Sequence, residues 1–63
     1  MSKYEYDESK RISAEGYSFY ALIMAAIRQA DSMNVEALRH AFPATHAELQ
    51  ARYNAPGGVI DGD

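Results

Sequence analysis

The feature that most constrains the fold is a helical repeat of apolar residues between Ile12 and Ala30. Apolar side chains recur there every three or four residues, which places them on one face of an α-helix. The line consists of Ile12, Gly16, Phe19, Ile23, Ala26 and Ala30, and Tyr20 and Ile27 flank it. The pattern predicts one long helix whose stripe faces the core. Gly16 costs about 1 kcal/mol relative to Ala inside a helix, so a kink, a break into two helices or a close contact there stays open.

The opposite side of this predicted helix carries almost no charge. Small residues recur along it at spacings of 4, 3 and 4, at Ala14, Ser18, Ala21 and Ala25. Small side chains let two helix backbones approach closely, and this spacing suits a near-parallel or antiparallel partner. We therefore predict a homo-oligomer, most simply a two-fold dimer. Its interface would consist of Ala14, Tyr17, Ser18, Ala21, Met24, Ala25 and Arg28. The alternative is that the alanines only favour helix on a solvated face.

Two short helices are predicted after the long one. Asn34 can begin a helix through "VEALRHAF", which Pro43 ends. Thr45 and Glu48 then form a capping box for a third helix, in which Glu48 and Arg52 are an i,i+4 pair. In this third helix His46, Leu49 and Tyr53 share one stripe. The fold class is therefore all-α.

The stretch "RYNAPGG" marks the end of the third helix. Asn54 can adopt the left-handed conformation that ends helices, and Pro56 with the two following glycines forbids continuation. We expect Tyr53 to pack back onto the core. At the other end, Asp7 can cap the first helix and pair with Arg11. The predicted organisation is a flexible lead-in (1–7), a helical domain (8–54) and a tail (55–63).

Composition excludes several ways of stabilising so short a chain. A chain of 63 residues buries a small core, and it contains no Cys for disulfides. His40 and His46 lie six residues apart without further ligands near, so we expect no metal site. Oligomerisation remains as the device that completes the core.

The same composition bounds the function. The serines lack the context of a catalytic triad and no Gly-rich motif is present, so we expect neither an enzyme nor a cofactor. A net charge of −3 argues against non-specific binding to nucleic acid. The longest apolar run, Phe19 to Ile27, is too short for a bilayer, and "MSKYEYDESKR" is too charged for a signal peptide. These features predict a cytoplasmic protein that does not engage membranes.

Aromatic residues suggest where a partner binds. Nothing local explains Tyr4 and Tyr6 in the polar lead-in, and exposed aromatics often anchor a partner protein. As an alternative, Tyr17 and Arg28 of different subunits could stack on and neutralise a nucleotide. A third hypothesis is a helix-turn-helix joined by "PAT", with Gln50 and Arg52 on the recognition helix, although the acidic balance opposes it.

The segments "LRHAFP" and "ELQARYNAPGG" resemble those of small helical open reading frames of bacteriophages and integrative elements. The resemblance covers roughly residues 17 to 58, and that group has no assigned activity from which site residues could be transferred. It implies a small non-enzymatic protein that acts by binding. A host protein that it modulates or inhibits, such as a defence or regulatory protein, is the expected partner.

Overall fold

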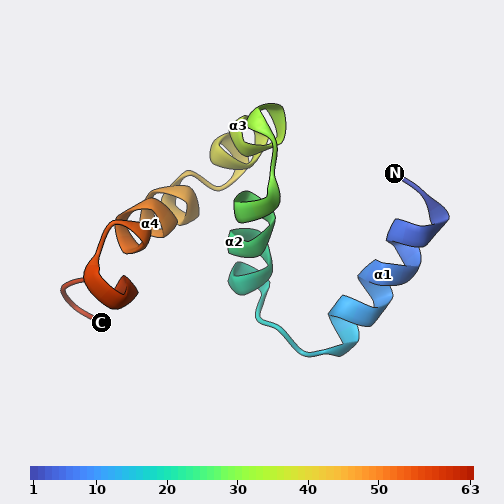
Figure 1. The fold of residues 1–63 in the computed structure, drawn as a ribbon, viewed down its shortest axis with the longest axis horizontal. Coiled ribbons are helices and arrows are strands. Elements are labelled where there is room, and N and C mark those ends of the chain that lie inside the picture. The colour runs from blue at the N-terminus through green and yellow to red at the C-terminus, as the bar shows by residue number, and fades with distance from the viewer.

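The computed structural model covers residues 1–63 and contains only helices (Figure 1). Their bounds are α1 (Lys3–Ala14), α2 (Phe19–Gln29), α3 (Ser32–Ala41), α4 (Pro43–Tyr53) and the short 3₁₀ turn η1 (Pro56–Gly58). The all-α prediction is therefore confirmed. The single long helix is wrong, because α1 and α2 are separate and four α-helices are present.

The break between α1 and α2 lies at Gly16. Its φ of 80° is in the left-handed region, which costs glycine little because it has no Cβ. The Ser18 hydroxyl then accepts a hydrogen bond from the Ala21 N–H at 3.2 Å and begins α2. Of the alternatives that the sequence leaves open at Gly16, the structure shows a break into two helices.

The start of α1 differs from the expected one. The Ser2 hydroxyl accepts a hydrogen bond from the Glu5 N–H at 3.1 Å, so the helix begins at Lys3. Asp7 is not the cap: it is inside α1 and pairs with Lys3 at 2.7 Å. Residues 3–7 of the predicted lead-in are thus helical, and the predicted Asp7–Arg11 pair is replaced by pairs of Arg11 with Glu8 and Glu15.

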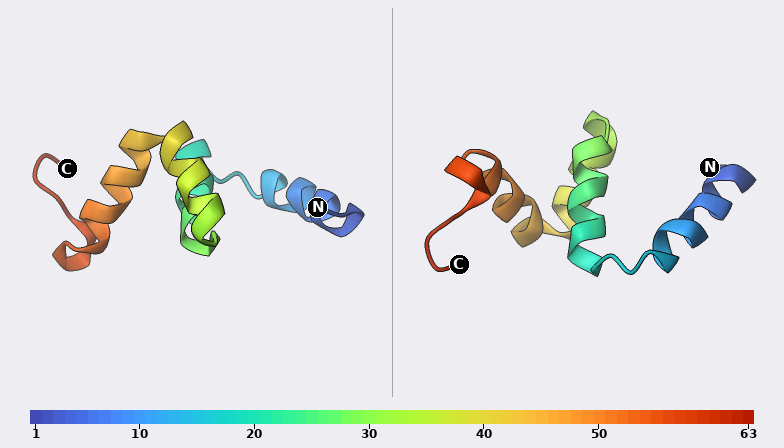
Figure 2. Two further views of the ribbon diagram at one scale, coloured as in Figure 1. Left: turned by 90° about the horizontal axis from the view of Figure 1, so that it is seen from above. Right: turned by 60° about the horizontal axis from the view of Figure 1, so that its bottom comes forward.

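Helices α2, α3 and α4 form the packed part of the chain. They are joined by only two residues after α2 and by Phe42 alone after α3, so each helix turns sharply onto the next. Helix α4 contacts both α2 and α3, whereas no Cα atom of α1 comes within 8 Å of these three helices. Figures 1 and 2 show α1 standing apart across the extended linker.

The core is very small. Only Ile27 of α2 and Leu49 of α4 are buried, with 8% and 9% of their surface exposed. At the other end of α2 the Phe19 ring meets the Phe42 ring edge to face at 5.9 Å, yet Phe19 stays largely exposed. The predicted stripe is thus wrong in its register. The break at Gly16 removes Ile12 from the packed helix, and the residue of α2 that is buried beside α4 is Ile27, which only flanked the stripe.

The caps of the short helices also differ from the predicted ones. Asp31 begins α3 by accepting a hydrogen bond from the Asn34 N–H at 2.8 Å. Pro43 does not only end α3 but is the first residue of α4, where its missing N–H has no intrahelical partner to lose. The predicted capping box at Thr45 is therefore wrong, because Thr45 lies inside α4.

The C-terminal end of α4 keeps its predicted position but not its predicted details. Asn54 has a φ of −89°, so the left-handed conformation belongs to Gly57 and Gly58 instead. Tyr53 is 76% exposed and does not pack onto the core. The predicted pair is confirmed, with Arg52 Nε 3.3 Å from Glu48 Oε2.

Candidate functional site

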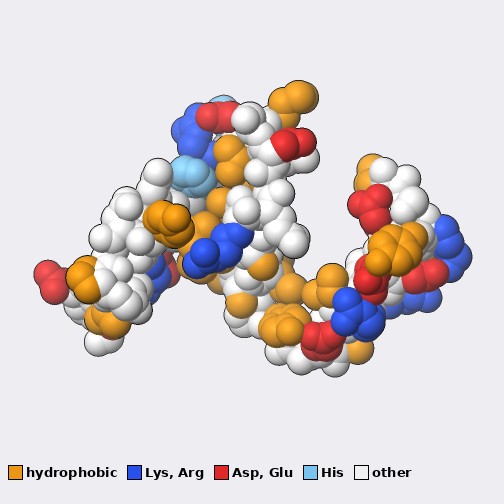
Figure 3. All heavy atoms as spheres, in the orientation of Figure 1, with side chains coloured by type: hydrophobic (Ala, Val, Ile, Leu, Met, Phe, Trp, Pro, Cys, Tyr) orange, Lys and Arg blue, Asp and Glu red, His pale blue; other side chains and the backbone are white.

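The chain exposes more surface than a compact protein of its size. Its accessible area is 5207 Å², whereas a compact monomer of this mass exposes about 4,000 Å². The radius of gyration is 13.4 Å, against about 11 Å for a compact chain of this length. Figure 3 shows hydrophobic side chains at the surface in the angle between α4 and α2 and around the linker to α1. About 1,200 Å² is therefore available for a partner to cover.

Helix α2 presents four of the predicted interface residues. Ala21, Ala25 and Arg28 are exposed, and Met24 is half-buried. Ala25 lies roughly 160° around the helix from the buried Ile27. Ala21 and Ala25 thus point away from the core, whereas Met24 and Arg28 lie nearer to α4 and line hollows beside it.

The other three predicted interface residues are not on that helix. Ala14 is the last residue of α1, and Tyr17 and Ser18 lie in the linker. The Ser18 hydroxyl is already used as the N-cap of α2. The break at Gly16 therefore divides the predicted stripe, and its continuous part runs from Ala21 to Arg28.

The nucleotide pairing of Tyr17 with Arg28 does not form within one chain. Tyr17 precedes α2 and Arg28 lies in its last turn, about 16 Å further along the helix axis. The neighbouring Glu15 carboxylate raises the pKa of the Tyr17 hydroxyl by accepting a hydrogen bond from it and by its charge.

Tyr4 and Tyr6 both lie on the detached α1 and are largely exposed. The Tyr4 hydroxyl donates a hydrogen bond to Glu8 at 3.2 Å. Two ammonium groups lie over the Tyr6 ring, Lys3 at 5.7 Å and Lys10 at 5.1 Å from its centroid. Both tyrosines thus have polar neighbours on their own helix, and both keep most of their surface exposed to a partner.

A groove lies between the last turns of α2 and the C-terminal half of α4. Its volume is about 430 Å³, and Ile27 and Leu49 are among its lining residues. The polar and aromatic side chains around it are Arg28, His46, Gln50, Tyr53 and Asn54. The stripe His46, Leu49 and Tyr53 already indicates one side of this groove from the sequence. The α2 side could not be inferred, because no local pattern says which residues α4 crosses.

Two further hollows are lined by fewer side chains that could bind a ligand through charge or stacking. One, of about 320 Å³, lies where Tyr20 and Met24 of α2 face the first half of α4. The other, of about 680 Å³, is lined by residues of α2, of α3 and of the turn between them, four of which are alanines, and it is bordered by Glu5 of α1. Neither brings a cation and an aromatic ring together.

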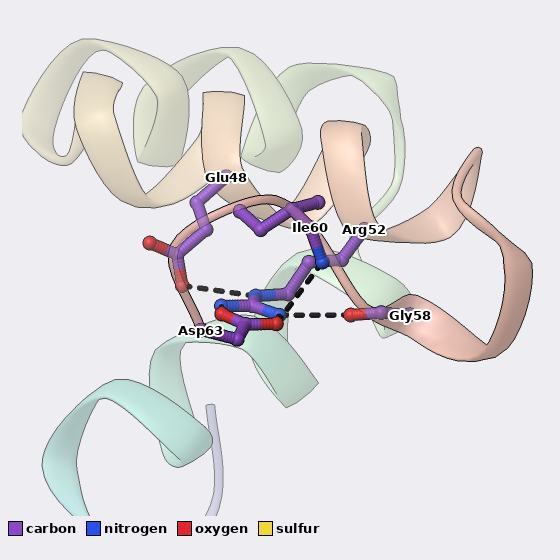
Figure 4. Close-up of polar contacts among 5 residues, drawn as sticks. All are labelled: Glu48, Arg52, Gly58, Ile60 and Asp63. Atoms are coloured by element: carbon purple, nitrogen blue, oxygen red, sulfur yellow. Dashed lines mark hydrogen bonds and ion pairs between the residues drawn. The ribbon is translucent and has the colours of Figure 1, made fainter.

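Arg52 organises the C-terminal segment (Figure 4). Its guanidinium donates to both carboxylate oxygens of Asp63, at 2.8 and 2.6 Å, and to the Gly58 carbonyl at 2.8 Å. The Ile60 N–H donates to the same carboxylate at 3.0 Å. These bonds lower the pKa of Asp63 to about 2, chiefly through the guanidinium. No local sequence pattern predicts this contact, because Arg52 and Asp63 are eleven residues apart.

His40 and His46 lie on different helices, α3 and α4, and no three His, Asp or Glu side chains gather where they could hold a metal ion. None of the helices has the length and apolar character needed to cross a membrane.

No protein-family model, no curated protein and no solved structure was found to match this chain.

Proposed function

We propose that this chain is a small non-enzymatic binding protein that acts as a homo-oligomer, most simply a two-fold dimer. The observation that carries the proposal is the mismatch between its core and its surface. Two residues are buried, while about 1,200 Å² of surface exceeds that of a compact monomer. Association is the general remedy for a chain with so small a core.

The area agrees with a dimer in which each chain covers the other. If each copy buries its excess, the interface removes about 2,400 Å² in total, which is the size of a stable obligate interface. The exposed face of α2 supports the contact, because Ala21 and Ala25 permit close approach of a second α2. Arg28 at its edge is the only charge on this face.

The dimer would present its remaining aromatic side chains to another protein. Tyr4 and Tyr6 on the detached α1 are the candidate anchors. The resemblance to small open reading frames of bacteriophages and integrative elements favours a host protein as the target, modulated or inhibited by binding. The helix-turn-helix hypothesis has weaker support, because Asp63 and Glu48 neutralise Arg52, the cation on which it depends.

Ala21→Glu tests the oligomer. The substitution places a carboxylate three residues after Ser18, the N-cap of α2, where an acid completes a capping box and favours the helix dipole. On a solvated face it should therefore stabilise α2 slightly. In a close helix–helix contact it buries a charge without a partner, which costs several kcal/mol. The change in stability caused by Ala21→Glu therefore has opposite signs on a solvated face and in a helix–helix contact.

We expect Ala21→Glu to dissociate the oligomer and lower its melting temperature. Ala47→Glu is the matched control, since Ala47 is exposed on α4 and outside the proposed interface. Light scattering and melting curves of both variants decide the matter. An unchanged mass with an unchanged or raised midpoint for Ala21→Glu would remove the α2 interface.

A further inference from the structure

The groove between α2 and α4 has an apolar floor, and its rim carries a positive charge without a negative one. Ile27 and Leu49, the two buried residues, reach it from opposite helices. Around them stand the cation Arg28, the aromatic ring of Tyr53, and the amide side chains of Gln50 and Asn54, together with His46. No Asp or Glu lines the groove.

Arg28 differs from every other basic residue of the chain. The remaining five each have a carboxylate oxygen within 4.0 Å, and they are Lys3, Lys10, Arg11, Arg39 and Arg52. Arg28 has none, so its charge is not neutralised by the chain. Its place in the last turn of α2 favours a cation through the helix dipole, but that does not require it to border a groove.

We propose that this groove binds a small organic anion that carries a flat ring. The ring would lie over Ile27 and Leu49 beside the Tyr53 ring, and the anionic group would pair with the Arg28 guanidinium. Gln50 and Asn54 offer both donors and acceptors to polar atoms on the ring. The volume of about 430 Å³ is within the range of small-molecule sites, which are mainly apolar with a few convergent polar groups. A nucleoside monophosphate and an aromatic carboxylate share this chemistry.

The groove shares Arg28 with the proposed oligomer contact, but it does not include Ala21 or Ala25. Arg28 is about 100° and Ala25 about 160° around α2 from Ile27, so Arg28 lies between the two surfaces. Binding in the groove therefore does not require the oligomer, and the Ala21→Glu variant separates the two proposals. An Ala21→Glu variant that becomes monomeric and still binds the anion would support both proposals. Unmodified protein that is already monomeric and binds the anion would retain this inference and refute the interface.

The test is a titration of the full chain, followed by amide chemical shifts, with four probes: adenosine 5′-monophosphate, adenosine, benzoate and inorganic phosphate. We expect the monophosphate or benzoate to shift the amides of residues around Ile27 and Leu49, and adenosine and phosphate to bind more weakly than the monophosphate. Binding of the monophosphate without benzoate identifies a nucleotide as the ligand class, and the reverse identifies a carboxylate. The proposal would be overturned if neither the monophosphate nor benzoate shifted these amides. It would also be overturned if inorganic phosphate bound as tightly as the monophosphate.

Two matched pairs of variants locate the site. Arg28→Gln should raise the dissociation constant about tenfold or more, while Arg39→Gln, which removes an exposed cation on α3 outside the groove, should leave it unchanged. Tyr53→Ala should weaken binding, whereas Tyr4→Ala on the detached α1 should not. Equal losses within either pair would show non-specific binding and refute the site.

Discussion

Replacing Leu49 by alanine tests whether the α2–α4 contact holds the fold. Leu49 is 9% exposed and lines the same groove as Ile27, the only other buried residue. Truncating a buried leucine to alanine costs about 2–5 kcal/mol of stability. The groove beside Leu49 lets water enter the vacated space, so we expect a value near the lower end, about 2–3 kcal/mol. A domain of this length has a net stability of about 3–9 kcal/mol, so the loss is a large fraction of the total.

The expected loss corresponds to a melting temperature lowered by roughly 10–20 °C. Urea and thermal unfolding followed by far-ultraviolet circular dichroism, at one protein concentration, measure it. Met33→Ala is the control, because Met33 is 84% exposed on α3 and its truncation should cost under about 0.5 kcal/mol. Equal small effects of Leu49→Ala and Met33→Ala would refute the reasoning that this contact is the core.

Two more predictions follow from single contacts. Ser18→Ala removes the N-cap of α2 and should lower the free energy of unfolding by about 1 kcal/mol, whereas Ser2→Ala removes the same kind of cap from the detached α1 and should leave the urea midpoint of the packed helices unchanged. Because Arg52 lowers the pKa of Asp63 from 3.8 to about 2, the tail contact should be fully present above pH 4 and lost as pH falls through about 2. An NMR titration of the Asp63 carboxyl checks this, and a midpoint at 3.8 would contradict it.

The sequence predicted well that helices form, but it predicted poorly which residues begin them and where the first one breaks. Periodicity, Pro43 and "RYNAPGG" mark where helices exist and where one ends, since these signals are local. Caps were less predictable, because several Ser, Asp and Asn residues stand near each helix start. Ser2 and Asp31 act as caps where Asp7 and Asn34 were expected. Gly16 could signal a kink, a break or a close contact, and only the tertiary structure selects the break.

For the candidate sites, too, features that depend on local helical geometry could be predicted, whereas contacts between separate helices could not. The spacing of His46, Leu49 and Tyr53 predicted their shared face, because it depends only on helical geometry. Ile27 was assigned to the edge of the core stripe, since a stripe drawn through Ile12 presumes an unbroken helix. Likewise, Ala14 fell into the predicted interface although the break places it on α1. Contacts between distant segments, such as Arg52 with Asp63, leave no periodic trace.

The most direct test of the central claim is the mass of the unmodified protein in solution. Analytical ultracentrifugation from micromolar to millimolar concentration should give at least twice the chain mass of 7.0 kDa, with dissociation only at the dilute end. A mass of one chain throughout that range would contradict the proposal that association completes the core.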